Sequence, residues 1–264
     1  MITFISLFSS SSANASYLAT EEGAYLIDCG MSSKQILESL QMAGLPSKTL
    51  KGIFVTHEHS DHIRGVGALS RKLSLPVIAS EGTWEGMEKT IGAIAPNNRV
   101  VFGKGESYFT NKMEVVPFTI PHDAQEPTGF RFMIGKNSIS IATDMGYYSS
   151  NVHNAIEGSD IVLLESNYDE DLLANNPKYP YSVKKRIKGK KGHLSNEACA
   201  EAAIKLCQSG TSHLLLGHLS AENNTEEIAY NVTQTALQSV DMLDRVTLHI
   251  AKRMNTTHGY QLQY

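Results

Sequence analysis

The sequence predicts an α/β fold in which two sheets are covered by helices. Short apolar, β-branched runs recur along all 264 residues, and stretches with helical periodicity separate several of them. Strands and helices are mixed in both halves of the chain, which is typical of α/β proteins. Hydrophobic residues make up 41% and charged residues 19%, a composition that fits a globular chain and excludes a disordered one.

Two strands are expected at the start of the chain, at 2–8 and 17–20, joined by a polar turn. The apolar start does not resemble a secretory signal, because no basic residue precedes Lys34. Further strands are expected at 24–28, 52–56, 76–79, 113–119, 128–134, 138–143, 161–165 and 213–219. Helices are expected at 32–43, 62–73, 81–91, 195–207 and 225–239. Ser195 and Thr225 are typical N-cap residues, and acidic residues follow both of them in the first turn.

The organisation of the chain suggests one domain over residues 1–264, because no linker, low-complexity tract or long repeat interrupts it. No apolar stretch approaches the roughly 18 residues of a membrane-spanning helix. The three cysteines, Cys29, Cys199 and Cys207, are an odd number and do not suggest a disulfide framework. Reduced thiols without a secretory signal predict a cytoplasmic protein with no membrane partner.

The strongest functional pattern is His57-Glu58-His59-Ser60-Asp61-His62, directly after the expected strand at 52–56. Residues two apart at a strand end project to the same side, so His57 and His59 can hold one metal ion. The chain then turns into a helix, which allows Asp61 and His62 to reach a second ion. Imidazole and carboxylate ligands favour zinc, iron or manganese. The alternative interpretation is an exposed polar turn.

Other candidate ligands lie where expected strands end. His122 follows the strand at 113–119, Asp144 follows 138–143, and His218 closes an apolar run. Each alone would more simply be a strand-end residue with ordinary hydrogen bonds. Together they supply the additional ligands that a two-metal site requires.

These motifs resemble those of the metallo-β-lactamase superfamily. Residues 57–62 are similar to its HxHxDH signature, and Asp28, His122, Asp144 and His218 fall in the order of its other motifs. A narrower resemblance is to the YycJ (WalJ) branch of bacterial metallohydrolases. It rests on Glu165-Ser166-Asn167, on Gly192-His193-Leu194-Ser195, on Gly217-His218-Leu219-Ser220 and on the residues around His122.

The resemblance implies a four-layer αββα sandwich, the metallo-β-lactamase fold, with a two-metal site at one edge. It implies that one ion is bound by His57, His59 and His122, and the second by Asp61, His62 and His218. Asp144 would bridge the two ions. Asp28 would orient a ligand histidine from behind, a role that strongly affects metal affinity.

The resemblance also assigns catalytic roles. Two neighbouring metal ions activate a water molecule, and Asp61 is the natural group to orient or deprotonate it. His193 resembles the additional histidine of phosphodiesterases such as RNase Z, which protonates the leaving oxygen. Glu165 would hold His193 in position. Without the resemblance, both would be read as ordinary surface residues.

A basic segment suggests the kind of substrate. The chain has 23 basic and 27 acidic residues and a net charge of −4, yet seven basic residues and no acidic one lie between Lys178 and Lys191. Tyr179 and Tyr181 alternate with these cations, a combination suited to nucleic acid. The alternative is a solvated helix face. The residues expected to contact phosphate are Lys184, Lys185, Arg186, Ser195 and Ser220.

The function expected from these observations is a two-metal phosphodiesterase acting on nucleic acid. The YycJ branch implies a 5′-to-3′ exonuclease acting on double-stranded DNA, with zinc as the default metal and manganese or iron as alternatives. The alternative enzyme is a small-molecule metallohydrolase acting on a thioester or a cyclic phosphodiester. A third alternative is a metal-binding accessory protein without activity.

Two parts of the sequence resist interpretation. Where the YycJ branch is expected to have glycines, the turn after the first strand reads Ser-Ser-Ser-Ser-Ala-Asn over residues 9–14. Ala13 disfavours a positive φ, which places a phosphate-binding role for Ser10 to Asn14 in doubt. His258, near the C-terminus, could not be assigned a role.

Overall fold

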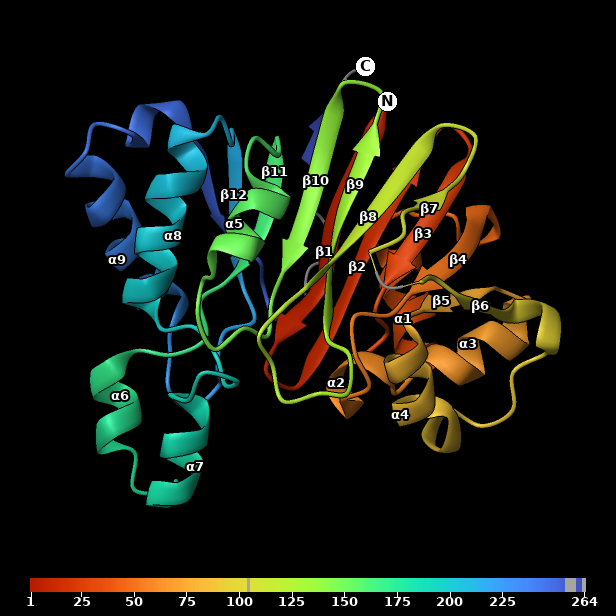
Figure 1. The fold of residues 1–264 in the computed structure, drawn as a ribbon, viewed down its shortest axis with the longest axis horizontal. Helices are drawn as coiled ribbons and strands as arrows, with labels where there is room; N and C mark the ends of the chain where they lie inside the picture. The colour runs from red at the N-terminus through yellow and green to blue at the C-terminus, as the bar shows by residue number, and fades with distance from the viewer. Residues whose placement is uncertain (104, 255–259, 263–264) are drawn as a thin grey trace. The chain divides into compact units, whose positions relative to one another are not determined.

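The computed structural model describes residues 1–103, 105–254 and 260–262, and the chain forms two compact units (Figure 1). The first comprises Met1–Glu114, Ala124–Thr128 and Lys252–Tyr264, and the second comprises Val115–Asp123 and Gly129–Ala251. That residues 1–264 are one domain stays a prediction. His258 lies outside the described residues.

The first unit contains a sheet of order β14-β1-β2-β3-β4-β5-β6. Its strands are β1 (Ile2–Ser10), β2 (Ala13–Thr20), β3 (Gly23–Ile27), β4 (Leu50–Phe54), β5 (Val77–Ala79), β6 (Arg99–Val101) and β14 (Tyr260–Leu262). Its helices are α1 (Ser33–Met42), η1 (Ser47–Thr49), α2 (Ser60–Ile63), α3 (Val66–Leu73), α4 (Glu81–Ile91) and η2 (Pro96–Asn98), and a short strand, β7 (Tyr108–Phe109), follows them.

The second unit contains a sheet in which β13, β12, β11, β10 and β9 are successive neighbours, followed by β8. Its strands are β8 (Met113–Thr119), β9 (Thr128–Ile134), β10 (Asn137–Ala142), β11 (Ile161–Glu165), β12 (His213–Gly217) and β13 (Thr247–Ile250). Its helices are α5 (Ser150–Ile156), α6 (Glu170–Asn175), α7 (Tyr181–Ile187), α8 (Asn196–Gln208), α9 (Glu226–Gln238) and η3 (Leu243–Arg245).

Each unit has its own apolar core between its sheet and its helices. In the first, Leu40 of α1 and Leu69 of α3 are buried in one cluster with Ile53 of β4. In the second, Leu206 of α8 belongs to a cluster with Leu164 of β11, and α9 packs on α8. Burial of these faces is the main force that fixes each helix against its sheet. In the described part of the chain, no helix is long and apolar enough to cross a membrane.

The expected α/β class with two sheets and helices is confirmed. The strands predicted at 113–119 and 161–165 and the helix at 81–91 agree with β8, β11 and α4. The predicted N-caps are also confirmed, since the hydroxyl of Ser195 accepts from Ala198 N and that of Thr225 from Ile228 N. The elements missed entirely include α6 and α7.

The polar turn predicted between the first two strands is shorter than expected. β1 and β2 form one long hairpin in which Ser9 pairs with Asn14 and Ser10 with Ala13, so the turn is confined to residues 11–12. The small hydroxyl side chains fit inside the sheet, where Ser9 and Ser10 are buried. Ala13 is extended, so the lack of glycine there causes no strain.

The helix predicted at 62–73 is two helices, separated at Gly65. Gly65 N donates to Cys29 O at 2.7 Å. A Cβ atom on Gly65 would lie 2.3 Å from Met31 O, so only glycine allows this close approach. The break lets α2 carry the last residues of the histidine motif while α3 packs on the core.

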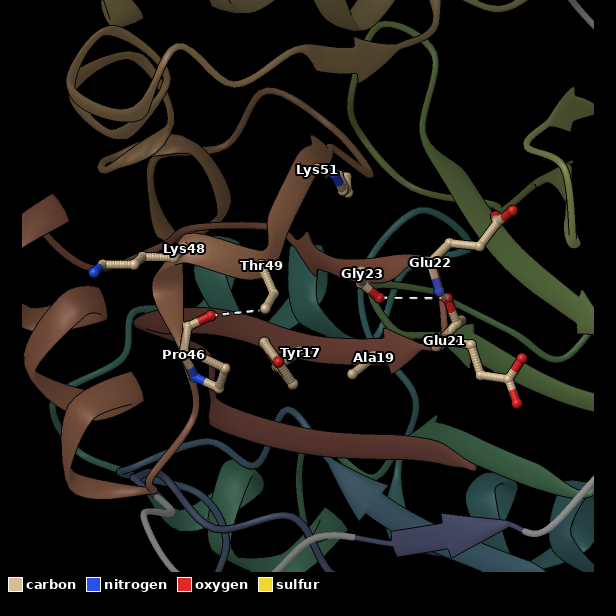
Figure 2. A pocket seen from close by; sticks show the side chains of 10 residues that line it. Tyr17, Ala19, Glu21, Glu22, Gly23, Pro46, Lys48, Thr49 and Lys51 are labelled. Carbon is tan, nitrogen blue, oxygen red and sulfur yellow. Dashed lines mark hydrogen bonds between the residues drawn. The ribbon is translucent and has the colours of Figure 1, made fainter.

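A surface pocket of about 420 Å³ lies elsewhere on the first unit, over β2, β3 and η1 (Figure 2). Tyr17, Glu21, Lys48 and Lys51 are among its lining residues. It contains none of the candidate site residues.

Candidate metal and catalytic site

The histidine motif of the first unit is anchored from behind by Asp28. Asp28 is buried and accepts from Thr56 N and Thr56 Oγ1, both at 2.8 Å. Its Oδ2 also lies 2.8 Å from His62 Nδ1. Because an ionised carboxylate can only accept, His62 donates from Nδ1 and directs the lone pair of Nε2 away from Asp28. This is the arrangement by which a carboxylate orients a metal-binding imidazole.

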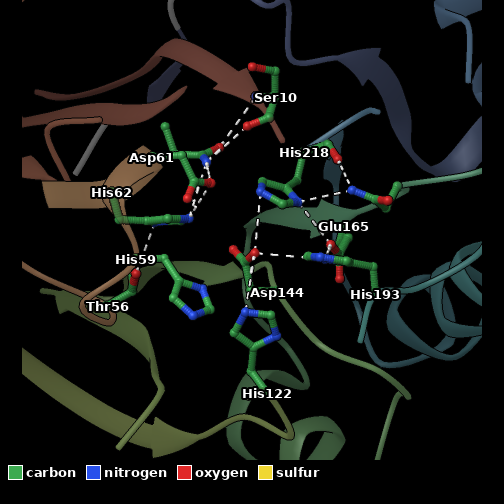
Figure 3. Close-up of polar contacts among 12 residues, drawn as sticks. Ser10, Thr56, His59, Asp61, His62, His122, Asp144, Glu165, His193 and His218 are labelled. Atoms are coloured by element: carbon green, nitrogen blue, oxygen red, sulfur yellow. Dashed lines mark hydrogen bonds and ion pairs between the residues drawn. The ribbon is translucent and has the colours of Figure 1, made fainter. Parts of the chain in front are cut away.

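Ligand atoms of the motif converge within the first unit (Figure 3). His57 Nε2 lies 3.1 Å from His59 Nδ1, and His62 Nε2 lies 3.3 Å from Asp61 Oδ2. Asn14 donates from Nδ2 to Asp61 Oδ2 at 3.2 Å. The two pairs have the chemistry and spacing of groups that share a cation.

The ends of three neighbouring strands bring polar side chains together in the second unit. β10, β11 and β12 are parallel neighbours, so their carboxyl ends meet at one edge of the sheet. Asp144 follows β10, Glu165 ends β11 and His218 follows β12. His218 Nε2 lies 3.3 Å from Asp144 Oδ1.

Glu165 organises two histidines at once (Figure 3). Its Oε1 accepts from His193 Nδ1 at 2.8 Å and from His218 Nδ1 at 2.9 Å. Its Oε2 accepts from the backbone N–H groups of Met145 at 2.7 Å and Leu194 at 3.2 Å. Both imidazoles therefore have a proton on Nδ1, and their Nε2 atoms remain available to bind a metal ion or to transfer a proton.

His122 is held in the same way by a carbonyl group. Its Nδ1 lies 3.2 Å from Gly192 O, so it donates there, and its Nε2 lies 3.8 Å from Asp144 Oδ1. Gly192 directly precedes His193, and the segment that carries His193 thus also orients His122.

The buried charges of the second unit shift one another's pKa. Burial raises the pKa of Glu165, but attraction and hydrogen bonds from His193 and His218 outweigh it, so the pKa lies below its ordinary value. Burial lowers the pKa of His193, but the charge and hydrogen bond of Glu165 outweigh it, so the pKa lies above its ordinary value.

The donor set fits a divalent transition metal. Asp144, Glu165, His193 and His218 each have one candidate ligand atom, and these atoms lie within 4.8 Å of one another. Glu165 accepts from Nδ1 of both histidines, which leaves the Asp144 carboxylate and His218 Nε2 as the donors for a metal ion. Imidazole nitrogens with carboxylate oxygens suit zinc, manganese or iron. The superfamily fold also implies divalent metal ions.

The residues expected to bind substrate are engaged in other contacts, with one exception. Lys184 donates to Ala174 O at 2.7 Å, and Arg186 pairs with Asp123 at 2.7 Å. The hydroxyl of Ser195 caps α8, and that of Ser220 accepts from the N–H groups of Glu222 and Asn223. Lys185 is exposed, and its side chain makes no hydrogen bond or ion pair among the described residues.

Sequence reasoning missed several residues that position the site. Asn14 contacts Asp61, Thr56 joins Asp28 to the motif, and Asn167 donates to His218 O at 2.8 Å. Asn167 belongs to the motif Glu165-Ser166-Asn167, and Asn14 belongs to the serine-rich segment at 9–14, but sequence reasoning assigned neither of them this role. Asn14 and Thr56 act through contacts with residues far away along the chain, which spacing does not reveal.

Residues 24–219 match the family described as the Beta-lactamase superfamily domain. The chain therefore belongs to the metallo-β-lactamase superfamily and is a metal-dependent hydrolase, as the motif predicted. It is 39% identical to exodeoxyribonuclease YycJ of Bacillus anthracis over 226 residues, which cover 86% of this chain and 85% of that protein.

Two further proteins extend the comparison. Exodeoxyribonuclease WalJ of Streptococcus pneumoniae is 37% identical over 238 residues, which cover 89% of this chain and 88% of that protein. The fold matches the metallo-β-lactamase fold protein YhfI of Bacillus subtilis with a TM-score of 0.71 and 15% identity, over 98% of each chain. The resemblance to the superfamily and to its YycJ branch is confirmed.

Proposed function

We propose that this protein is a two-metal phosphodiesterase that degrades nucleic acid, acting on DNA as a 5′-to-3′ exonuclease. The observation that carries the proposal is the short hydrogen bond between Glu165 and His193 beside Asp144. It supplies an oriented imidazole for proton transfer next to a candidate metal ligand. Thioester hydrolysis has less need of such a group, because a thiolate leaves without a proton more easily than an alkoxide.

The proposed metal ligands are His57, His59, Asp61, His62, His122, Asp144 and His218. Their chemistry fits zinc, which we propose as the resident metal, with manganese or iron as alternatives. When bound, two such ions would act as Lewis acids and lower the pKa of a water molecule. Asp28 would fix the orientation of His62 through the contact at Nδ1.

Residues of this chain would carry out the proton transfers. Asp61, steadied by Asn14, is the proposed group that orients or deprotonates the attacking water. His193, protonated on both nitrogens and held by Glu165, is the proposed donor to the leaving oxygen. The elevated pKa of His193 favours this protonated form. Glu165 is a positioning residue, because it acts through His193 and His218.

The names of the two exodeoxyribonuclease relatives support DNA as the substrate. The basic segment supports it independently, because α7 is joined directly to the candidate site. His193 N donates to Ile187 O at 2.9 Å, which fixes the end of the basic helix beside the proposed acid. Cations placed there would attract a polyanionic strand.

The proposal is tested with duplex DNA labelled at the 5′ or the 3′ end, single-stranded DNA and RNA. Purified protein is loaded with zinc or manganese, and His193→Ala and Asp61→Asn serve as controls. Release of nucleotides in order from the 5′ end, abolished by both substitutions, is the expected result. Turnover of a small ester or a cyclic phosphate without degradation of any polymer would contradict the proposal and favour the small-molecule hydrolase.

A further inference from the structure

The basic segment of the second unit consists of two kinds of cation. Lys178 pairs with Glu222, Lys188 with Glu170 and Arg186 with Asp123, while Lys184 donates to a carbonyl at the end of α6. Lys184 and Lys188 connect α7 and its C-cap to α6, which lies beside α7 in Figure 1. By contrast, Lys185, Lys190 and Lys191 are exposed, and their side chains make no hydrogen bond or ion pair among the described residues.

Lys190 and Lys191 are held next to the proposed acid by the backbone. Gly192 N donates to Gly189 O at 2.8 Å, and His193 N donates to Ile187 O at 2.9 Å, so residues 187–193 form one tight loop. A Cβ atom on Gly192 would lie 2.1 Å from Ile187 O, which shows how closely the loop is packed. The backbone of both lysines therefore lies within the loop that leads to His193.

The loop that follows Asp144 packs against this lysine loop. A Cβ atom on Gly146 would lie 2.4 Å from the carbonyl carbon of Lys190, so the two backbones are in direct contact. Tyr147 comes next and is 48% exposed. An exposed aromatic ring and two cations without acidic partners among the described residues thus lie on two adjoining loops, one following Asp144 and the other leading to His193.

We propose that Tyr147, Lys190 and Lys191, here named the rim patch, hold the nucleic-acid strand on either side of the scissile phosphate. The proposal rests on the proposed function and identifies the residues that select a polymer over a small phosphodiester. The lysines contact flanking phosphates as point charges, and Tyr147 stacks on a base. Lys184 and Arg186, expected from sequence to bind substrate, instead hold the segment in place.

The chemistry of the rim patch favours a nucleic-acid strand over a protein or small ligand. Exposed lysines without acidic partners bind phosphate without base specificity, and an exposed tyrosine stacks on any base. Both properties suit an enzyme that must advance along a strand of arbitrary sequence. A small phosphodiester has no flanking phosphate and no neighbouring base, so it would gain nothing from the patch.

The test compares Lys190→Gln/Lys191→Gln with Lys178→Gln/Lys188→Gln, which removes the same charge from cations that have acidic partners. Binding of catalytically inactive metal-loaded protein to single-stranded DNA is measured across a range of salt concentrations. Loss of two phosphate contacts should reduce the slope of log affinity against log salt by about 1.4. The control should keep the wild-type slope. Tyr147→Ala should weaken binding about tenfold and leave the slope unchanged.

A second measurement separates this inference from the proposed function. In otherwise wild-type protein, the rim variant should lower kcat/KM for DNA far more than kcat/KM for bis(p-nitrophenyl) phosphate. One outcome is that the wild type degrades DNA while the rim variant keeps the wild-type salt slope and the wild-type ratio of kcat/KM for the two substrates. In that case the proposed role of the rim patch is wrong and the proposed function stands. If both double variants lose the same slope, general charge rather than the patch binds the strand. If the wild type degrades no nucleic acid, both proposals are wrong.

Discussion

The buried carboxylate of Glu165 fixes the orientation of two histidines in the candidate site. Four donors converge on its two oxygens, two from histidines and two from the backbone. A carboxylate with this many donors stays ionised, and each imidazole that donates to it has a proton on Nδ1. The position of a proton on His193 and on His218 is thus decided by a residue that need not touch the substrate.

The cysteines give a prediction at the same scale. Burial raises the pKa of Cys199 to about 12 and that of Cys207 to about 11, and it raises the pKa of Cys29 as well. At pH 8 about one Cys207 in a thousand would be thiolate, so the native protein should react very slowly with a thiol reagent such as Ellman's reagent. All three should react at once in denaturant.

The same shifts predict the effect of pH on stability. Because the folded state holds these protons more tightly, the stabilisation is complete below the unfolded thiol pKa, near 9, and is lost as pH rises towards the folded values. The free energy of unfolding should therefore fall above pH 9. Rapid labelling of any native thiol at pH 8 would contradict this account.

At the scale of elements, the site depends on sharp turns at the ends of strands. Asp28 and His218 follow β3 and β12 directly, Asp144 comes two residues after the end of β10, and all three have a positive φ near +60°. Such a conformation costs a residue other than glycine about 1–3 kcal/mol and occurs mainly at functional sites.

The ends of these strands could be predicted from the sequence, whereas other elements could not. The ends of β8, β10 and β12 were predicted within two residues, and those ends pointed to His122, Asp144 and His218. The β1–β2 hairpin was misjudged because serines, which commonly signal turns, are buried in its strands. Helices α6 and α7 were missed because they have only 6 and 7 residues, which is too short for a helical period to be recognised.

Ser195 provides a prediction for the helix that it caps. Ser195→Ala should lower the free energy of unfolding by about 1 kcal/mol, as should Thr225→Ala at the cap of α9, because each hydroxyl accepts from an N–H of the first turn. Thermal or urea denaturation measures both effects, and Thr225→Ala serves as the matched control. A rise in KM for DNA with Ser195→Ala alone would support the phosphate contact expected from sequence.

At the scale of the whole molecule, each unit carries a different set of candidate site residues. The first carries the histidine motif and its carboxylate support, and the second carries Asp144, the two histidines on Glu165 and the basic segment. The sequence could predict the motif because its residues are consecutive, and it could predict His193 and Glu165 only through resemblance. It could not separate paired from exposed lysines, because their partners, such as Asp123 and Glu222, lie far away along the chain.

The central claim is that His193 protonates the leaving oxygen of a nucleic-acid phosphodiester. The most direct measurement compares His193→Ala with the wild type on DNA, whose leaving alkoxide needs a proton, and on bis(p-nitrophenyl) phosphate, whose nitrophenolate does not. We expect a loss of about 10²- to 10⁴-fold in kcat on DNA and less than about tenfold on the nitrophenyl ester. Glu165→Gln should show the same selectivity to a smaller extent. An equal loss on both substrates would contradict the account.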